Sequence, residues 1–263
     1  MSSNKNKLLF HRRLPSSIAL TDFSPSALGS AEAPPSAIPV PDYLEQVYWW
    51  AYVRPWAIRL FERGWLVNLI LFGNYRRLIE AALDAFGREL PGRTLQVACV
   101  YGDLTPHVSG HVAPGGALDV VDVVPAQLDN LRRKLPAGAP VSLIHRDSGA
   151  LGFADASYDQ ALLYMLLHEQ PERVRRRTLA EVMRVVRSGG KIVIIDYHRP
   201  ARWHPLRGFL RFILDTLEPF APDLWEHEIR HYLPSGVAIA DLSKQTYFGG
   251  MYQRVVIVRG SKL

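Results

Sequence analysis

The sequence predicts an α/β fold: a mostly parallel sheet of seven strands with helices on both faces, an N-terminal helical extension and a C-terminal antiparallel hairpin. Short apolar runs alternate with helix-forming segments from residue 91 onward. Most of these runs are apolar throughout, which is typical of parallel strands buried on both faces. The last two runs are joined by Gly249 and Gly250, a turn that favours a hairpin.

The predicted elements follow in order. We expect strands at residues 94–100, 117–121, 141–145, 158–163 and 191–197, and hairpin strands at 244–248 and 252–258. Helices are expected at 104–111, 125–135, 172–187 and around 205–217. Pro125 is well suited to open the second of these helices, and Ser188-Gly189-Gly190 to stop the third.

Three regions differ in composition. Residues 1–40 are rich in Ser, Pro and Ala and predict a disordered leader. Residues 41–90 are helical in pattern and strongly aromatic, and residues 91–263 form the α/β domain. The aromatic segment has two interpretations: it packs against the sheet as a lid, or it lies in a membrane interface where its arginines meet lipid phosphates. We expect a mixture of both.

Charge and cysteine content narrow the class of protein. The net charge is +6, which favours an acidic partner, but no nucleic-acid-binding module is present, so we expect none. A single cysteine, Cys99, excludes a disulfide framework. No apolar run reaches the roughly 18 residues that span a bilayer. We therefore expect a cytoplasmic bacterial protein peripheral to the inner membrane, or a mitochondrial one if the source is eukaryotic.

Polar residues gather where the predicted strands end. Ligands of open parallel sheets bind beyond the carboxyl ends of the strands. The segments to examine are Ala98–Asp103, Asp122, Arg146-Asp147-Ser148, Tyr164–Glu169 and Asp196-Tyr197-His198.

Four stretches resemble the class I S-adenosylmethionine-dependent methyltransferases, especially their quinone C-methyltransferase branch. They are Val121-Asp122-Val123-Val124-Pro125, Phe153-Ala154-Asp155-Ala156-Ser157-Tyr158-Asp159, Leu166-Leu167-His168, and Glu181-Val182-Met183-Arg184-Val185-Val186-Arg187-Ser188-Gly189-Gly190. The resemblance implies a class I methyltransferase-like (Rossmann-type) fold that binds S-adenosylmethionine. It makes Asp122 the acceptor of both ribose hydroxyls, and Asp147 with Ser148 the contact to the adenine amino group. The alternatives are a helix cap for Asp122 and a solvated loop residue for Asp147. Further cofactor contacts are expected at Val97, Ala98, Gly102, Val123 and Tyr164.

The glycine-rich turn of that family is altered here. Gln96 takes the place of an acid in the first strand, Ala98 and Val100 take the first two glycine positions, and Gly102 is retained. A β-branched Val does not give the open backbone approach of glycine. Either the cofactor site is degenerate, or it holds the cofactor for a reaction other than methyl transfer.

The run from Gln96 to Asp103, together with Tyr48–Tyr52 and Trp65–Asn68, resembles the RquA family of rhodoquinone biosynthesis. This resemblance implies that ubiquinone is the substrate and that an amino group replaces a ring methoxy group. It also implies that S-adenosylmethionine supplies the nitrogen and that manganese(II) is required. The predicted catalytic residues are His168, Tyr101 and Gln96, the last because a neutral side chain keeps the cofactor amine unprotonated.

The predicted metal ligands are His168, Asp196 and His198, which follow two adjacent strands and suit manganese. Each of them also fits a simple hydrogen-bonding role. A rival set is His227 and His231, four residues apart on a predicted helix that also carries Glu228.

Two other functions stay open on the sequence alone. One is a quinone or lipid methyltransferase whose glycine loop has drifted, and the other is a non-catalytic cofactor-binding subunit of a membrane quinone-biosynthesis complex. The sequence does not determine the oligomeric state.

Overall fold

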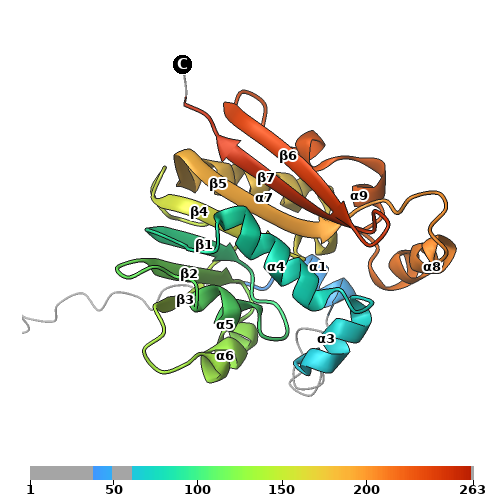
Figure 1. Cartoon of the computed structure of the whole chain (residues 1–263), viewed down its shortest axis with the longest axis horizontal. Helices are drawn as coiled ribbons and strands as arrows, with labels where there is room; N and C mark the ends of the chain where they lie inside the picture. The colour runs from blue at the N-terminus through green and yellow to red at the C-terminus, as the bar shows by residue number, and fades with distance from the viewer. Residues whose placement is uncertain (1–37, 49–60, 262–263) are drawn as a thin grey trace, which may run out of the picture. The chain divides into compact units, whose positions relative to one another are not determined.

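A seven-stranded sheet forms the centre of the molecule in the computed structural model, which describes residues 38–48 and 61–261 (Figure 1). Its strand order is β3-β2-β1-β4-β5-β7-β6. The strands are β1 (Arg93–Val97), β2 (Ala117–Asp122), β3 (Val141–His145), β4 (Tyr158–Tyr164), β5 (Val186–Tyr197), β6 (Ile239–Tyr247) and β7 (Tyr252–Arg259). The first five pair in parallel, whereas β7 is antiparallel to both β5 and β6. The predicted parallel sheet with a C-terminal hairpin is confirmed.

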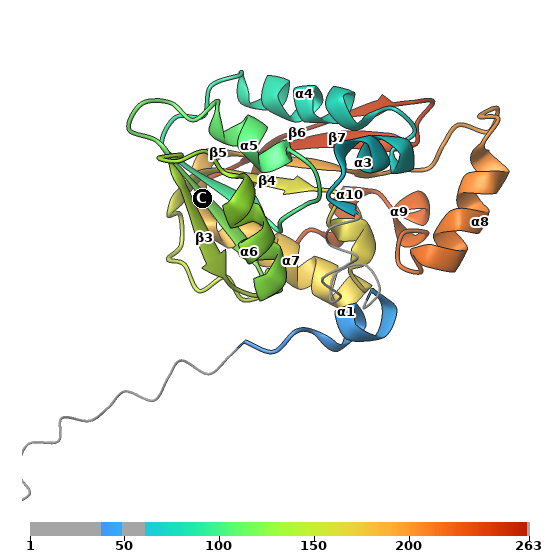
Figure 2. The ribbon, with the colours of Figure 1, turned by 90° about the horizontal axis from the view of Figure 1, so that it is seen from below.

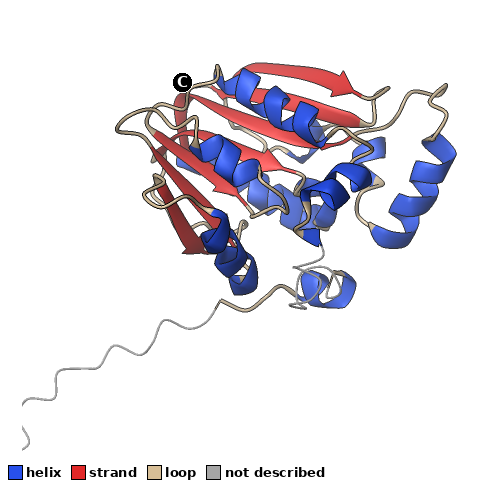
Figure 3. Cartoon of the chain, turned by 60° about the horizontal axis from the view of Figure 1, so that its bottom comes forward, coloured by secondary structure: helices blue, strands red, loops and turns tan. Residues whose placement is uncertain are grey.

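Helices cover both faces of this sheet (Figures 2 and 3). Those after the N-terminal segment are α5 (Leu104–Ser109), α6 (Pro125–Lys134), α7 (Glu172–Val185), α8 (Arg207–Leu217), α9 (Asp223–Glu226) and α10 (Ile229–Tyr232), with a 3-10 turn, η2, at Leu167–Glu169. Leucines of α5, α6 and α8 join the core on one face, and α7 and α10 contribute to the core on the other. A sheet with two covered faces explains the apolar runs Ala161–Leu163 of β4 and Ile192–Ile195 of β5.

Three described helices lie in the aromatic region: α1 (Asp42–Val47), α3 (Gly64–Ile70) and α4 (Tyr75–Phe86). In α4 the buried residues recur every three or four positions, among them Leu78, Ala82 and Phe86, and the helix ends at Gly87 with φ 92°. The predicted leader falls almost wholly on residues 1–37, which lie outside the described residues, as do residues 49–60. No helix of the described ranges is long and apolar enough to span a membrane.

Several element boundaries differ from the prediction; β6, for example, begins at Ile239 rather than at residue 244. β1 ends at Val97 rather than at residue 100, because the next residue, Ala98, has a left-handed φ of 72° that no strand continues. α7 ends at Val185, and the chain enters β5 at once, so Ser188-Gly189-Gly190 lies within a strand rather than after a helix. The pairing shifts register between Tyr158 and Gln160 of β4, which lie opposite Val186 and Lys191, so the extra residues of this early start are on β5.

One fully buried arginine ties together segments that are far apart in the sequence. Arg175 of α7 donates to the backbone oxygens of Leu167, Gln170 and Phe220 at 2.8–2.9 Å. Its guanidinium also lies over the ring of Tyr232. The turn η2 and the loop after α8 are therefore attached to the same side chain.

Candidate functional site

Two pockets meet where the strand order reverses, between β1 and β4. Such a reversal is where open α/β sheets bind their ligands. A small pocket of about 50 Å³ lies beside Asp122, and a large one of about 540 Å³ lies beneath α3 and α8. The two share four lining residues: Ala98, Cys99, Leu166 and Glu169. A ligand in the first pocket therefore lies next to a ligand in the second.

Asp122 ends β2 and is almost wholly buried in the small pocket. One carboxylate oxygen accepts the backbone N–H of Cys99 at 2.7 Å, and the other accepts that of Val124 at 2.8 Å. Burial raises the pKa of Asp122 to about 6, although these hydrogen bonds oppose the shift. Each oxygen accepts one N–H and retains a lone pair, so the carboxylate can still accept the two hydroxyls of a ribose.

The turn after β1 keeps the backbone shape of a glycine turn although its first two glycine positions are substituted. Ala98 has φ 72°, which is unusual for a residue with a Cβ, and Gly102 has φ 84°. The retained glycine is required by its surroundings, because a Cβ at Gly102 would lie 2.4 Å from the hydroxyl oxygen of Tyr75.

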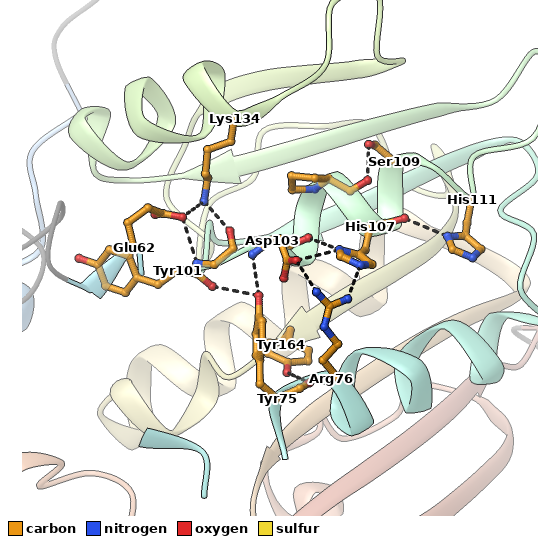
Figure 4. Close-up of polar contacts among 12 residues, drawn as sticks. Glu62, Tyr75, Arg76, Tyr101, Asp103, His107, Ser109, His111, Lys134 and Tyr164 are labelled. Carbon is orange, nitrogen blue, oxygen red and sulfur yellow. Dashed lines mark hydrogen bonds and ion pairs between the residues drawn. The ribbon is translucent and has the colours of Figure 1, made fainter. Parts of the chain in front are cut away.

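Protein contacts on several sides hold this turn (Figure 4). The Tyr75 hydroxyl accepts the N–H of Asp103 at 2.7 Å and donates to the carbonyl of Tyr101 at 3.3 Å. Glu62 accepts the N–H of Gly102 at 3.1 Å, and Lys134 donates both to Glu62 and to the Gly102 carbonyl. These hydrogen bonds therefore hold the substituted turn in its glycine-like conformation.

Gly102→Ala should destabilise the protein by roughly 1–3 kcal/mol, because a Cβ there is strained at positive φ and collides with Tyr75. Gly115→Ala is the matched control, since Gly115 also has a positive φ (79°) but has open space around its Cβ position. Urea unfolding of both variants isolates the effect of the Tyr75 contact. Equal midpoints for the two variants would show that the contact does not matter.

Gln96 lies beneath the same turn, fully buried, and lines neither pocket. Its side-chain amide donates to the carbonyl of Ala98 at 3.0 Å and to the hydroxyl of Thr105 at 2.9 Å. Its predicted influence on a cofactor amine would therefore be electrostatic and would not involve contact. That influence stays a prediction.

The small pocket brings together four predicted cofactor residues, namely Ala98, Asp122, Val123 and Ser148. Val97 is buried in β1, and Tyr164 lines the large pocket instead. Asp147 lines neither pocket, and its carboxylate accepts the N–H of Gly149 at 2.8 Å. Gly102 likewise lines neither pocket.

Helix α1 covers the small pocket. Tyr43 and Leu44 line it, and Leu44 packs on Val124. Burial raises the pKa of the Tyr43 hydroxyl, and the negative charges of Glu169, Asp147 and Asp122 add to this shift. With α1 in place, about 50 Å³ remains, whereas small-molecule sites usually offer roughly 300–1,000 Å³. A nucleoside at Asp122 therefore requires α1 to shift.

The large pocket is mostly apolar and has a volume typical of a small-molecule site. Its walls come from α3, from α8 and from the ends of β1 and β4, and the predicted residues Tyr101 and His168 face it. The Tyr101 hydroxyl accepts a hydrogen bond from the side-chain amide of Gln127 at 2.9 Å, and its ring lies 5.7 Å from that of Phe61. Such a pocket suits a flat apolar ring.

His168 and Asp196 form a buried pair at the floor of this pocket. The Nδ1 atom of His168 lies 2.8 Å from Asp196, whose carboxylate also accepts the N–H groups of Leu167 and Tyr197. Burial by itself lowers the pKa of His168, but Asp196 outweighs it, with Glu218 and Glu169 adding to the effect, and the pKa rises to about 9. At neutral pH the pocket floor therefore carries an imidazolium.

The predicted metal trio does not converge, and here the structure departs from the sequence-based prediction. Both oxygens of Asp196 are occupied by the three donors just described. His198 turns away: its Nδ1 atom lies 2.9 Å from the carbonyl of Gly250, and its Nε2 atom faces Glu228 and Lys244. Among the described residues, no group of three or more His, Cys, Asp or Glu side chains could hold a metal ion.

The rival histidines do not form the predicted helical pair either. His227 follows the end of α9, and His231 lies on the separate helix α10. Their rings are 4.2 Å apart, but His231 contacts Arg176 on α7 and neither histidine lines the large pocket. They therefore belong to a different surface of the protein than His168.

Two acids at the site were not predicted. Glu169, next to His168, lines both pockets. Glu218, just after α8, accepts a hydrogen bond from Tyr48 at 2.8 Å, and burial raises the pKa of its carboxyl group. Glu169 belongs to the segment Tyr164–Glu169, which follows a predicted strand, so its position in the chain could have indicated a role at the site. Glu218 had no such signal.

Comparisons with known proteins agree with this architecture. Residues 94–190 match the family model described as a methyltransferase domain. An uncharacterized methyltransferase of Synechocystis is 26% identical over 155 residues, which cover 59% of this chain and 68% of that protein. The demethylmenaquinone methyltransferase of Staphylococcus aureus is 27% identical over 135 residues, which cover 51% of this chain and 55% of that protein. This chain thus spans about half the length of that relative.

The fold comparison gives the same result. A crystal structure of an S-adenosylmethionine-dependent methyltransferase from Aquifex aeolicus matches with a TM-score of 0.51 and 17% identity, and the match covers 78% of this chain and 98% of that one. At this identity the likeness shows the fold alone. Together with the strand order, it shows that the chain has a class I methyltransferase-like fold, and the family match over residues 94–190 supports a place in the S-adenosylmethionine-dependent methyltransferase superfamily.

Proposed function

We propose that this protein is an S-adenosylmethionine-dependent enzyme whose substrate is a lipid-soluble quinone. The observation that carries the proposal is the apolar cavity of about 540 Å³ that meets the Asp122 pocket at shared residues. A quinone ring fits such walls, and a cofactor at Asp122 would lie beside it. The name of the Staphylococcus aureus relative, a demethylmenaquinone methyltransferase, supports a quinone as the substrate class.

We further propose that the reaction replaces a ring methoxy group of ubiquinone by an amino group and so makes rhodoquinone. The resemblance to the RquA family and the substituted turn at Ala98 and Val100 support this choice over methyl transfer. When bound, the cofactor supplies the amino nitrogen. A nitrogen–carbon bond forms at the ring, the carbon–oxygen bond to the methoxy group breaks, and methanol leaves. One water molecule completes the exchange: the bond between this nitrogen and the α-carbon of the donor breaks, the carbon takes the hydroxyl group and the nitrogen keeps the hydrogen.

Two residues in the wall of the large cavity match the proton requirements of this exchange. The departing methoxy oxygen needs a proton, and protonated His168 in the cavity wall is placed to give one. The incoming amine must lose a proton, and Glu169 lies on the boundary of both pockets to accept it. The manganese(II) requirement implied by the resemblance finds no ligand set in the described ranges, so no step is assigned to a metal.

A labelled cofactor decides between the two reactions. Purified protein is incubated with ubiquinone and S-adenosylmethionine carrying heavy nitrogen in its amino group and deuterium in its methyl group, with and without manganese. We expect a lighter quinone that contains the heavy nitrogen. Because every ring position of ubiquinone is already substituted, the alternative, quinone methylation, is tested in a parallel incubation with demethylmenaquinone, where a heavier product containing deuterium would establish it. An unchanged quinone under all conditions would contradict both reactions and favour a binding subunit.

Gln96→Glu should lower amino transfer at least tenfold while cofactor affinity holds or rises. A carboxylate within about 4–6 Å raises the pKa of an amine by 1–3 units, so a second acid besides Glu169 would keep more of the amine protonated. The loss should shrink as the pH rises, which turnover measured across the pH range will show.

Thr105→Val is the control, because it removes the hydrogen-bond partner of Gln96 without adding charge. It should lower turnover without a change in pH dependence. Wild-type turnover of Gln96→Glu at every pH would mean that amine activation does not depend on this position.

A further inference from the structure

Within residues 38–48 and 61–261, the large apolar side chains that are exposed gather in two regions. All of the large apolar side chains that are well exposed in the described part of the chain lie on α3 or within a few residues of α8. They are Trp65, Leu69 and Ile70 in the first region, and Trp203, Phe209, Phe212 and Leu217 in the second. The exposed fractions are large: 77% for Trp203, 65% for Phe212 and 62% for Trp65. Single exposed apolar residues are ordinary, but a cluster of aromatic ones marks a binding surface.

The solvent-facing side of helix α8 carries large apolar side chains beside the polar Arg211, Asp215 and Thr216. Leu210 and Leu214, four residues apart, are buried against the core, whereas Phe209 and Phe212 project outward. The outward face of a surface helix is normally polar. Its two exposed phenylalanines indicate that this side of α8 contacts something other than water.

The two regions surround the entrance to the large cavity. Helices α3 and α8 lie at the same end of the sheet, at the right in Figures 1 and 2. Leu69, Ile70, Phe209 and Leu217 are both exposed to solvent and part of the cavity wall. The apolar surface therefore continues from the outside of the protein into the cavity, without a polar rim at these positions.

Positive charge accompanies this surface. Arg63 directly precedes α3, and Arg199 and Arg202 precede the exposed Trp203. All three are exposed, and within the described ranges none of them forms an ion pair. Arginines beside exposed Trp and Phe are the combination that binds an anionic lipid surface, because the guanidinium meets phosphate while the ring enters the acyl boundary. A second copy of this chain would present the same positive charge, so it matches this surface less well.

We propose that α3, α8 and the residues around Trp203 form a docking surface for an anionic lipid bilayer, with the cavity entrance facing the membrane. The proposal rests on the proposed function in one respect, that the cavity takes a quinone dissolved in that bilayer. Such a substrate then passes from lipid into the cavity along a continuous apolar path. The sequence predicted a membrane interface in the aromatic N-terminal region, and α8 extends it with a segment from the other end of the chain.

Flotation with vesicles tests the surface without any quinone. The full-length protein is mixed with vesicles of phosphatidylcholine and phosphatidylglycerol, and Trp203→Ser and Phe212→Ser are compared with the wild type. Neither residue lines the cavity. Each substitution should reduce vesicle binding about tenfold, as expected when one large apolar side chain no longer enters the bilayer. Both variants should unfold at the wild-type temperature, because the side chains are exposed.

A charge-matched pair provides the second arm. Arg199→Gln with Arg202→Gln should weaken binding to phosphatidylglycerol vesicles more than Arg132→Gln with Arg133→Gln, which removes two charges from α6. Wild-type vesicle binding by both aromatic variants would overturn the proposal. Equal losses of vesicle binding in the two double-arginine variants would overturn it too. So would a stable dimer of the protein in solution that Phe212→Ser disrupts.

The quinone assignment is tested separately from the surface. Turnover of a short-tailed, water-soluble ubiquinone should be the same in the wild type and in the two aromatic variants, whereas turnover of long-tailed ubiquinone in vesicles should fall with binding. If vesicle binding depends on Trp203 and Phe212 but no quinone is converted, the docking surface stands and the proposed reaction fails.

Discussion

Asp196→Asn should lower the pKa of His168 below its ordinary value and reduce quinone turnover at neutral pH about a hundredfold or more. Burial and Asp196 act in opposite directions on this imidazole, and the wild-type pKa of about 9 exists because Asp196 outweighs burial. Asparagine keeps the shape and removes the charge, so His168 becomes neutral and no longer donates a proton. General acid catalysis typically contributes roughly 10²–10⁴-fold. The imidazole signals of labelled protein, followed by NMR across the pH range, report the pKa independently of activity.

The same pair makes stability depend on pH. The folded pKa of His168, about 9, lies above its ordinary value of 6.5. The contribution of the pair to the free energy of unfolding is therefore complete below about pH 6.5 and disappears as the pH rises through about 9. Asp196→Asn should remove this dependence. Asp119→Asn is the control, because the buried Asp119 pairs with Arg93, which does not titrate in this range. An unchanged His168 pKa in Asp196→Asn would refute the assignment of the pair.

Asp122→Asn should weaken S-adenosylmethionine binding by about ten- to a hundredfold. Loss of hydrogen bonds to a charged acceptor costs roughly 1.5–3 kcal/mol, and the amide oxygen can replace only one of the two carboxylate acceptors. Asparagine is a better choice than alanine here, because Asp122 also accepts the N–H groups of Cys99 and Val124, and alanine would leave both without this partner. Isothermal titration calorimetry measures the affinity.

The affinity of the wild-type protein for S-adenosylmethionine should decrease as the pH is lowered. Since the pKa of Asp122 is raised to about 6, the carboxylate becomes neutral below that pH and loses its charge-assisted hydrogen bonds. Asp122→Asn should bind weakly at every pH, whereas Asp119→Asn, altered in the same strand but hydrogen-bonded to Arg93 and Tyr158, should bind as the wild type does. Tight binding by Asp122→Asn would remove Asp122 from the cofactor site.

The sheet, and the sheet edge at which Asp122 and His168 lie, could both be predicted from local patterns in the sequence. Strand periodicity is local, and the ends of parallel strands necessarily meet, so Asp122 and His168 could be placed at one edge from their positions in the chain alone. The conformation of Ala98 could not be predicted, because a left-handed alanine contradicts the local preference and depends on surrounding contacts.

The incorrect predictions have one physical cause: segments that are distant in the sequence pack against the site. His198 follows its strand as predicted, but the turn between β6 and β7 returns over it and provides the Gly250 carbonyl. The outer wall of the cavity likewise comes from α8, which no motif marked. Packing between segments separated by many residues is not contained in local patterns, and it determines which polar residues face a cavity and which face the protein.

The buried Arg175 has a consequence for local unfolding. Its guanidinium holds the backbone of Leu167 and Gln170, on either side of His168, and of Phe220, two residues after Glu218. Releasing either segment would leave a buried cation short of hydrogen-bond acceptors, which is costly enough to oppose a partial opening. The two segments then exchange their amide hydrogens as one cooperative unit, and the acidic and imidazole sides of the cavity keep their mutual spacing until that unit opens as a whole.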